Sequence, residues 1–131
     1  MATHGFIEYS EAPEEERAVY DDIMATRRTA WVINLWNAIA DDSVTLRRTW
    51  LSVKEVIAPG ALNPLTKEMI YLAISASNQW GYGIASHTAA ARKAGMTDAM
   101  LRELMAIVEM ANETNRLANG YRVPVDPAFQ T

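Results

Sequence analysis

The stretch Thr66–Gly95, TKEMIYLAISASNQWGYGIASHTAAARKAG, carries the strongest information about how this chain folds. Just before it, Asn63 can cap a helix and Pro64 suits the first helical position, so we predict a helix that runs to about Ser77. This helix is apolar on nearly all sides, which favours a place at the centre of the fold. A second helix follows, and we expect it to end at Gly95, because glycine readily adopts the left-handed conformation that stops a helix.

Helical patterns separated by short turns occupy most of the remaining sequence. The expected helices span residues 13–28, 31–40, about 42–57 and 97–120. Apolar side chains in the third of these recur at the three-and-four spacing of one buried face. No two alternating segments are joined by a hairpin turn, so we do not expect a sheet. The sequence therefore predicts an all-α fold, in which about six helices form a compact single-domain bundle.

The length of the chain indicates one domain. With 131 residues, half of them hydrophobic, it is long enough for a real core and too short for two comfortable domains. Within this single domain, 1–131, we expect residues 1–12 to form a loosely ordered arm. Residues 121–131 contain two prolines and are expected to form an extended tail.

The composition argues against several kinds of partner. A net charge of -4 leaves no basic footprint, so we expect neither nucleic acid nor an anionic membrane to bind. The longest mostly apolar run, Met69–Ala76, is much shorter than the roughly 20 residues that a membrane helix needs. The first residues lack the apolar segment of a signal peptide, so we predict a cytoplasmic location.

The chain contains no cysteine. Disulfides, thiolate metal sites, iron–sulfur clusters and thiol-based redox chemistry by this chain alone are therefore excluded. Its two histidines are His4, near the N-terminus, and His87. Two such distant ligands are too few for a metal ion, so we predict no metal and no cofactor.

His87 stands out in the second helix of the quoted stretch. It shares one helix face with residues spaced by three and four positions, namely Trp80, Gly83, Ala91 and Ala94. Gly83 lies one turn before His87 and leaves a hollow beside the imidazole. His87 is then either a buried residue with a structural partner or part of the wall of a small pocket.

Glu68 is the second candidate, in the early part of the apolar helix. One interpretation is that the helix dipole favours an acid near the N-terminus, where nearby basic side chains can pair with it. The other is that Glu68 reaches His87 and selects its tautomer, as carboxylates do in acid–base sites. Tyr82 or Tyr71 could add a phenol to the same pocket, although tyrosines at this spacing more often pack in cores or interfaces.

Together these residues resemble the core of the AhpD-like alkylhydroperoxidase and carboxymuconolactone decarboxylase family. Members of that family have a Glu on one helix, a C-x-x-C at the start of the next and a His four residues later. The matching positions here are Glu68, Asn78, Tyr82, His87 and Gly95. The two cysteine positions hold Trp80 and Gly83 instead, so the thiolate nucleophile of the family's peroxidases is missing. The resemblance therefore makes alkylhydroperoxidase activity the least expected function.

Two functions remain as hypotheses. In the first, Glu68 and His87 perform acid–base chemistry on a small organic acid or lactone, or bind it, in a pocket lined by Tyr82, Trp80 and Gly83. Such an enzyme would act as a lyase or isomerase. The decarboxylases of the family usually carry a carboxylate at the position of Gly83 and basic residues nearby, which this chain lacks. In the second hypothesis the protein is catalytically inactive and serves as an oligomeric binding or structural protein, and the resemblance implies a homotrimer or homohexamer.

Overall fold

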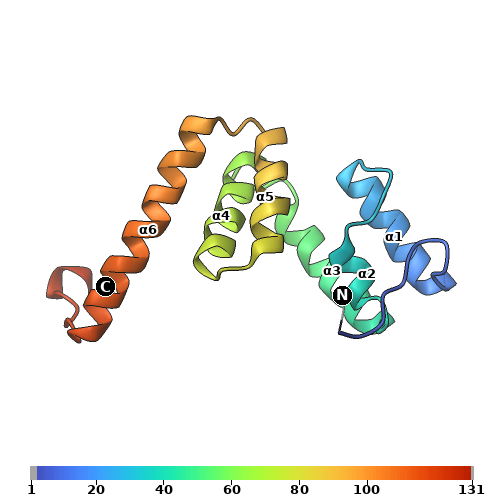
Figure 1. Ribbon diagram of the computed structural model, residues 1–131, viewed down its shortest axis with the longest axis horizontal. Coiled ribbons are helices and arrows are strands. Elements are labelled where there is room, and N and C mark those ends of the chain that lie inside the picture. The colour runs from blue at the N-terminus through green and yellow to red at the C-terminus, as the bar shows by residue number, and fades with distance from the viewer. Residues whose placement is uncertain (1–2, 131) are drawn as a thin grey trace. The chain divides into compact units, whose positions relative to one another are not determined.

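The computed structural model describes residues 3–130, and within them all regular secondary structure is helical (Figure 1). The helices are α1 Glu14–Arg27, α2 Asn34–Ile39, α3 Ser43–Ile57, α4 Pro64–Ser77, α5 Gly81–Lys93 and α6 Asp98–Gly120, followed by the short 3-10 helix η1 Pro127–Phe129. No strand occurs among these residues. The prediction of an all-α fold with about six helices is confirmed.

The residues expected to begin and end helices do so in the structure. The Asn63 side chain accepts a hydrogen bond from the Thr66 N–H at 2.8 Å and so caps α4. Asp42 and Thr97 cap α3 and α6 through the same kind of contact. Gly95 follows α5 with a φ of 110°, a backbone conformation that favours glycine. Only α2 is clearly shorter than expected, since residues 31–33 precede it in a non-helical conformation.

The contacts of the chain divide into two compact units, Met1–Ala58 and Pro59–Thr131. Each contains its own cluster of buried apolar side chains, and each is described by itself below. The single-domain boundary 1–131 stays a prediction.

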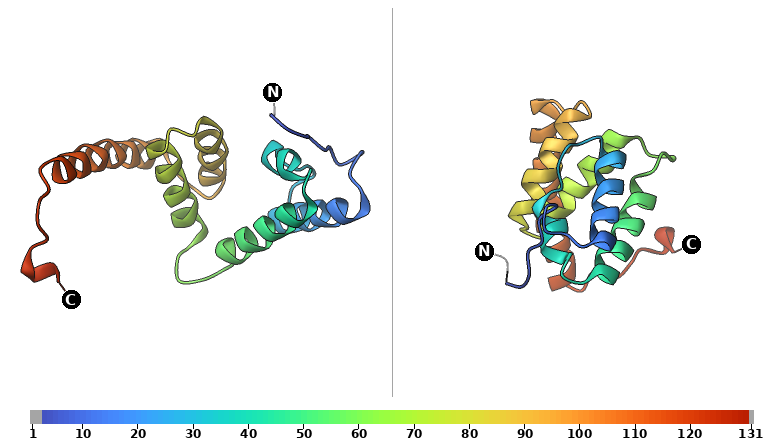
Figure 2. Two further views of the ribbon diagram at one scale, coloured as in Figure 1. Left: turned by 90° about the horizontal axis from the view of Figure 1, so that it is seen from below. Right: turned by 90° about the vertical axis from the view of Figure 1, so that its right-hand side faces the viewer.

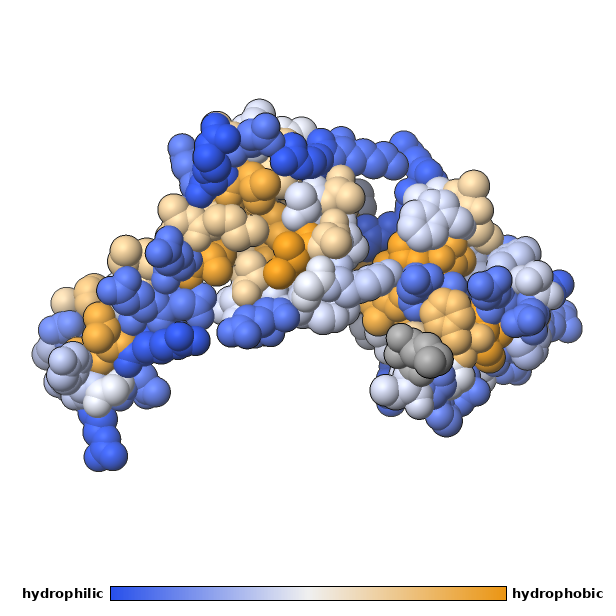
Figure 3. Space-filling model, viewed as in Figure 1, coloured by the Kyte–Doolittle hydropathy of each residue, from blue (hydrophilic) through white to orange (hydrophobic). Residues whose placement is uncertain are grey.

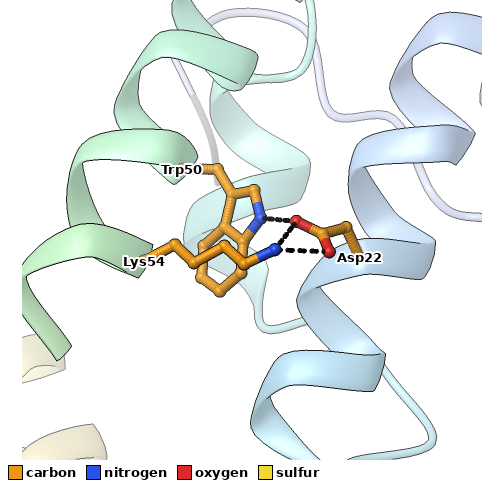
Figure 4. A network of polar contacts seen from close by, with 3 residues as sticks. All are labelled: Asp22, Trp50 and Lys54. Carbon is orange, nitrogen blue, oxygen red and sulfur yellow. Dashed lines mark hydrogen bonds and ion pairs between the residues drawn. The ribbon is translucent and has the colours of Figure 1, made fainter. Parts of the chain in front are cut away.

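The first unit has a core rich in aromatic residues. Tyr20, Leu46 and Trp50 are fully buried in it, and the ring of Trp36 meets that of Trp50 edge to face at 5.5 Å. At the margin of this core, Asp22 joins α1 to α3 (Figure 4). Its carboxylate accepts hydrogen bonds from Trp50 Nε1 at 2.7 Å and from Lys54 Nζ at 2.8 Å. The hydrogen bond from Lys54, and to a smaller extent the one from Trp50, hold the pKa of Asp22 below its usual value.

Hydrogen bonds and burial tie parts of the segment before α1 to the first unit, and the loose arm expected for residues 1–12 stays a prediction. The Ile7 N–H donates to the Asn37 carbonyl at 3.0 Å, and the Tyr20 hydroxyl donates to the Ile7 carbonyl at 2.8 Å. Burial, and then the charge of Glu16, raise the pKa of Tyr20 to about 12, so its hydroxyl remains protonated and able to donate. Ala12 is also buried in the core. Residues 7 and 12 are thus tied to the first unit, while residues 1 and 2 lie outside the described part of the chain.

In the second unit, α4 packs against both α5 and α6 (Figure 2). Its core centres on Leu72, Ala91, Met96 and Leu104. Small side chains on α5, such as Ala91, let the α4 and α5 backbones come close together. The sequence placed the apolar helix at the centre of the fold, and within this unit α4 has that position.

The surface of the second unit carries several large apolar side chains, which appear as orange regions in the hydropathy view (Figure 3). The most exposed on the helices α4 to α6 are Ile74, Ile107, Met110 and Leu117. The tail after α6 is exposed as far as it is described and contains only the one turn of η1. No helix in residues 3–130 is both long and apolar enough to cross a membrane. The cytoplasmic location stays a prediction.

Candidate functional site

Glu68 and His87 meet between α4 and α5. His87 Nδ1 lies 2.8 Å from Glu68 Oε2, a good hydrogen-bond distance. The side chains are largely sheltered from solvent, with 12% of Glu68 and 16% of His87 exposed. A carboxylate only accepts hydrogen bonds, so the N–H group at Nδ1 donates a hydrogen bond to Glu68. This contact favours the tautomer of the neutral ring in which Nδ1 is protonated and Nε2 is not.

Tyr71 covers one face of the same imidazole. Its ring centroid is 4.6 Å from that of His87 and the two planes are inclined by only 15°, which is a stacked arrangement. Tyr71 and Glu68 are three residues apart on α4, so they project from the same side of that helix. Helix α4 therefore contacts the imidazole of His87 both at the edge of the ring, through Glu68, and on the face of the ring, through Tyr71.

Trp80 and Gly83, where the family resemblance led us to expect cysteines, form a tightly packed pair. A Cβ atom placed on Gly83 would lie 2.2 Å from Trp80 Cε3 and 2.6 Å from the Oγ of the buried Ser75. Real Cβ atoms do not approach other atoms so closely. The indole thus occupies the space that any side chain at position 83 would need, and the hollow expected above Gly83 is filled by Trp80.

The turn between α4 and α5 places Trp80 over Gly83. Gln79 has a positive φ of 58°, and the Trp80 N–H then donates to the Ser75 carbonyl at 3.0 Å. With its backbone held in this way, the Trp80 ring lies on the first turn of α5. The ring is still 44% exposed, so one side of it faces outward.

Tyr82 lies beside Trp80. Their ring centroids are 5.7 Å apart with planes inclined by 33°, and Tyr82 is 38% exposed. The structure therefore places Tyr82 with Trp80 at the start of α5. Its role as a hydrogen-bond donor to a substrate stays a prediction.

The second unit also contains an open groove that the sequence analysis did not identify. It has a volume of about 570 Å³ and is lined by Ala76, Ser77, Gln79, Glu109, Asn112, Glu113, Arg116 and Leu117. Polar residues at three-and-four spacing on α6 signal a polar face, but the opposite wall comes from the end of α4 and has no such signal. None of the predicted site residues lines the groove. Within residues 3–130, no three His, Asp or Glu side chains gather as metal ligands would.

Comparison with known proteins places this chain in a family. Residues 45–126 match the carboxymuconolactone decarboxylase family, so the chain belongs to that family. It is also similar to the crystal structure of the alkylhydroperoxidase AhpD core from Rhodospirillum rubrum, with 47% sequence identity and a TM-score of 0.95. That similarity covers 100% of this chain and 98% of the other. A search of curated proteins found no match.

The family and the fold predicted from the quoted stretch are both confirmed. The matched region contains Glu68 and His87 as well as Trp80 and Gly83. The chain is a member of the family without any cysteine. Its candidate site thus combines a Glu–His pair with a tryptophan packed on a glycine.

Proposed function

We propose that Glu68 and His87 form a non-thiol site that binds a small organic acid or lactone and performs acid–base chemistry on it. The observation that carries this proposal is the sheltered hydrogen bond between Nδ1 and Oε2. A carboxylate on Nδ1 leaves Nε2 as the nitrogen that can take up a proton, and it stabilises the imidazolium that then forms. Trp80 and Tyr82 are the residues proposed to border the bound compound, while Gly83 supports it from beneath the Trp80 ring.

An isomerisation illustrates the chemistry. In an unsaturated lactone with a double bond one carbon away from the carbonyl group, Nε2 takes a proton from the carbon between them. The electron pair of that C–H bond moves into conjugation with the carbonyl, and the double bond shifts. The imidazolium then gives the proton to the carbon of the original double bond that lies farther from the carbonyl group. Glu68 keeps its charge throughout and balances that of His87.

Deuterium exchange tests this proposal directly. The protein is incubated in D₂O with a panel of unsaturated five-membered lactones and small carboxylic acids, and proton NMR follows the loss of protons next to the carbonyl group. We expect exchange with the unaltered protein and with His4→Gln, and a loss of at least about 100-fold in His87→Gln, the lower end of what a general base contributes. Exchange that is equal in His87→Gln and the unaltered protein would contradict the proposal.

A hydroperoxide assay tests the accompanying claim about thiols. Without cysteine there is no nucleophile to attack the peroxide, so we expect hydroperoxide consumption to equal that of buffer. A thiol peroxidase serves as the positive control. Clear turnover by this protein would overturn the inference.

The second candidate function is that of a catalytically inactive oligomeric protein, a homotrimer or homohexamer. Two observations favour it, namely the space above Gly83 taken by Trp80 and the exposed apolar side chains of the second unit. Light scattering coupled to size-exclusion chromatography measures the oligomeric state. A trimer or hexamer that binds no member of the lactone and acid panel would support this function over the first.

A further inference from the structure

The arrangement of Tyr71 and Glu68 around His87 has a geometric consequence. The hydrogen bond to Glu68 acts at the edge of the imidazole, through Nδ1. The Tyr71 ring acts on its face, at 4.6 Å and an inclination of 15°. A ring held only at one edge can still swing about that hydrogen bond, whereas a ring stacked on its face cannot tilt without losing the stacking contact.

We propose that Tyr71 is a positioning residue that fixes the plane of His87 and thereby the direction in which Nε2 points. This role rests on the acid–base function proposed for the pair. Tyr71 acts through His87 and needs no contact with a substrate. Because Glu68 and Tyr71 both belong to α4, the register between α4 and α5 sets both contacts together.

The aromatic ring of Tyr71 carries this role. Among residues 3–130 its hydroxyl has no hydrogen-bond partner, while its ring stacks on His87. Phenylalanine at this position should therefore retain the proposed function, and leucine, an apolar side chain without a ring, should remove it. The other aromatic pair of the unit, Trp80 with Tyr82, does not include His87 and leaves its plane unconstrained.

NMR of the His87 side chain tests the proposal without any substrate. The spectrum of the protein with ¹⁵N-labelled histidine is recorded at a pH above which further base no longer changes the imidazole signals. His4→Gln removes the second histidine, so every imidazole signal belongs to His87. The variants Tyr71→Phe and Tyr71→Leu are compared in this background, with Ile70→Leu as a matched control at an exposed position of α4.

We expect the unaltered residue and phenylalanine to give the same spectrum, with the Nδ1–H tautomer dominant and the ring protons of His87 shifted upfield by the neighbouring ring. In Tyr71→Leu the upfield shift should disappear and the two nitrogen signals should move toward each other as the second tautomer becomes populated. Ile70→Leu should leave all signals in place. A purely structural role for Tyr71 lowers the melting temperature but does not move the tautomer ratio.

The proposal is overturned if Tyr71→Leu keeps the tautomer ratio and the ring-proton shifts of the unaltered protein. If Tyr71→Leu does not fold, nuclear Overhauser effects in the unaltered protein decide the question. Contacts between the ring protons of Tyr71 and His87 support the proposal, and their absence contradicts it. Because none of these measurements involves a lactone or an acid, a failed exchange assay does not affect their outcome.

Discussion

Each of the two units contains a carboxylate that accepts a hydrogen bond from a nitrogen of a side chain on another helix, but the two clusters differ in kind. In the first unit, Asp22 accepts from both Trp50 and Lys54, whose side chain is 42% exposed. In the second unit, Glu68 accepts from His87, which is only 16% exposed and stacked on Tyr71.

Solvent exposure and the type of base determine what each cluster can do. Water screens the half-exposed pair of Asp22 and Lys54, and lysine stays charged at any neutral pH. The sheltered pair of Glu68 and His87 interacts in a lower dielectric, and histidine gains and loses its proton near neutrality. The comparison indicates that the first cluster ties two helices together, whereas the second is the sheltered, titratable pair for which we propose acid–base chemistry.

The largest effect on the comparison is expected from Gly83→Val. The new side chain enters the space of the Trp80 ring and of Ser75, so the free energy of unfolding should fall by about 3 kcal/mol, a typical cost of overpacking. Urea-induced unfolding measures this loss. Gly81→Val is the matched control, because nothing lies within 4 Å of a Cβ at Gly81. Adding Trp80→Ala to Gly83→Val should recover part of the stability, and no recovery would show that the two residues are not packed together.

The next effect concerns the sheltered pair itself. Glu68→Leu leaves the largely buried Nδ1–H of His87 without its acceptor, which should lower the free energy of unfolding by about 2 kcal/mol. Glu68→Gln keeps an acceptor and should cost less. Glu103→Gln, at an exposed position of α6, should have almost no effect in the same urea titration. A loss equal to that of Glu103→Gln would mean that Glu68 and His87 are not coupled.

A smaller change is expected at the half-exposed cluster. Asp22→Asn removes the charge beside Lys54 but keeps an oxygen that accepts from Trp50, so the loss should be about 0.5 kcal/mol. A double-mutant cycle with Lys54→Met isolates the energy of the ion pair. Should this coupling exceed that of the Glu68 pair, the distinction drawn from solvent exposure would be wrong.

The smallest expected effect is a decrease of the free energy of unfolding at acidic pH. Because the folded state holds the pKa of Asp22 below its unfolded value of about 3.9, the carboxylate stabilises the protein fully above that value. The contribution is lost as the pH falls through the folded-state pKa. The stability difference between the unaltered protein and Asp22→Asn should therefore shrink as the pH falls from about 5 through the folded-state pKa. A difference that grows on acidification would reverse the assigned sign.

Local patterns allowed most of the helices to be predicted. Asn63 with Pro64 and the cap at Thr97 mark helix starts that the structure reproduces. Ile7, in the stretch expected to be a loose arm, is held by the Asn37 carbonyl and the Tyr20 hydroxyl, two partners far along the chain. The expected helix 31–40 proved shorter because residues 31–33 are not helical and Ile33 is extended. No pattern in the nearby sequence indicates the hydrogen bonds of Ile7 or the conformation of residues 31–33.

The candidate site was predicted less completely than the fold. The family resemblance brought Glu68 and His87 together and identified Trp80 and Gly83 as the cysteine positions. It did not indicate that Tyr71 stacks on His87, because stacking depends on the rotation of α4 relative to α5. The groove between α4 and α6 also has walls from distant segments, so no single stretch of sequence marks it.

The amino-acid sequence by itself determined the helices, membership of the family and the lack of a thiol nucleophile. These properties depend on residue type and on spacings of three or four residues, which act within one helix. Only the tertiary structure decided that Glu68 Oε2 and His87 Nδ1, 19 residues apart, lie 2.8 Å from each other and that the Trp80 ring fills the space above Gly83. Both results depend on how helices pack and which side-chain rotamers they allow, and helical periodicity does not encode these to within an ångström.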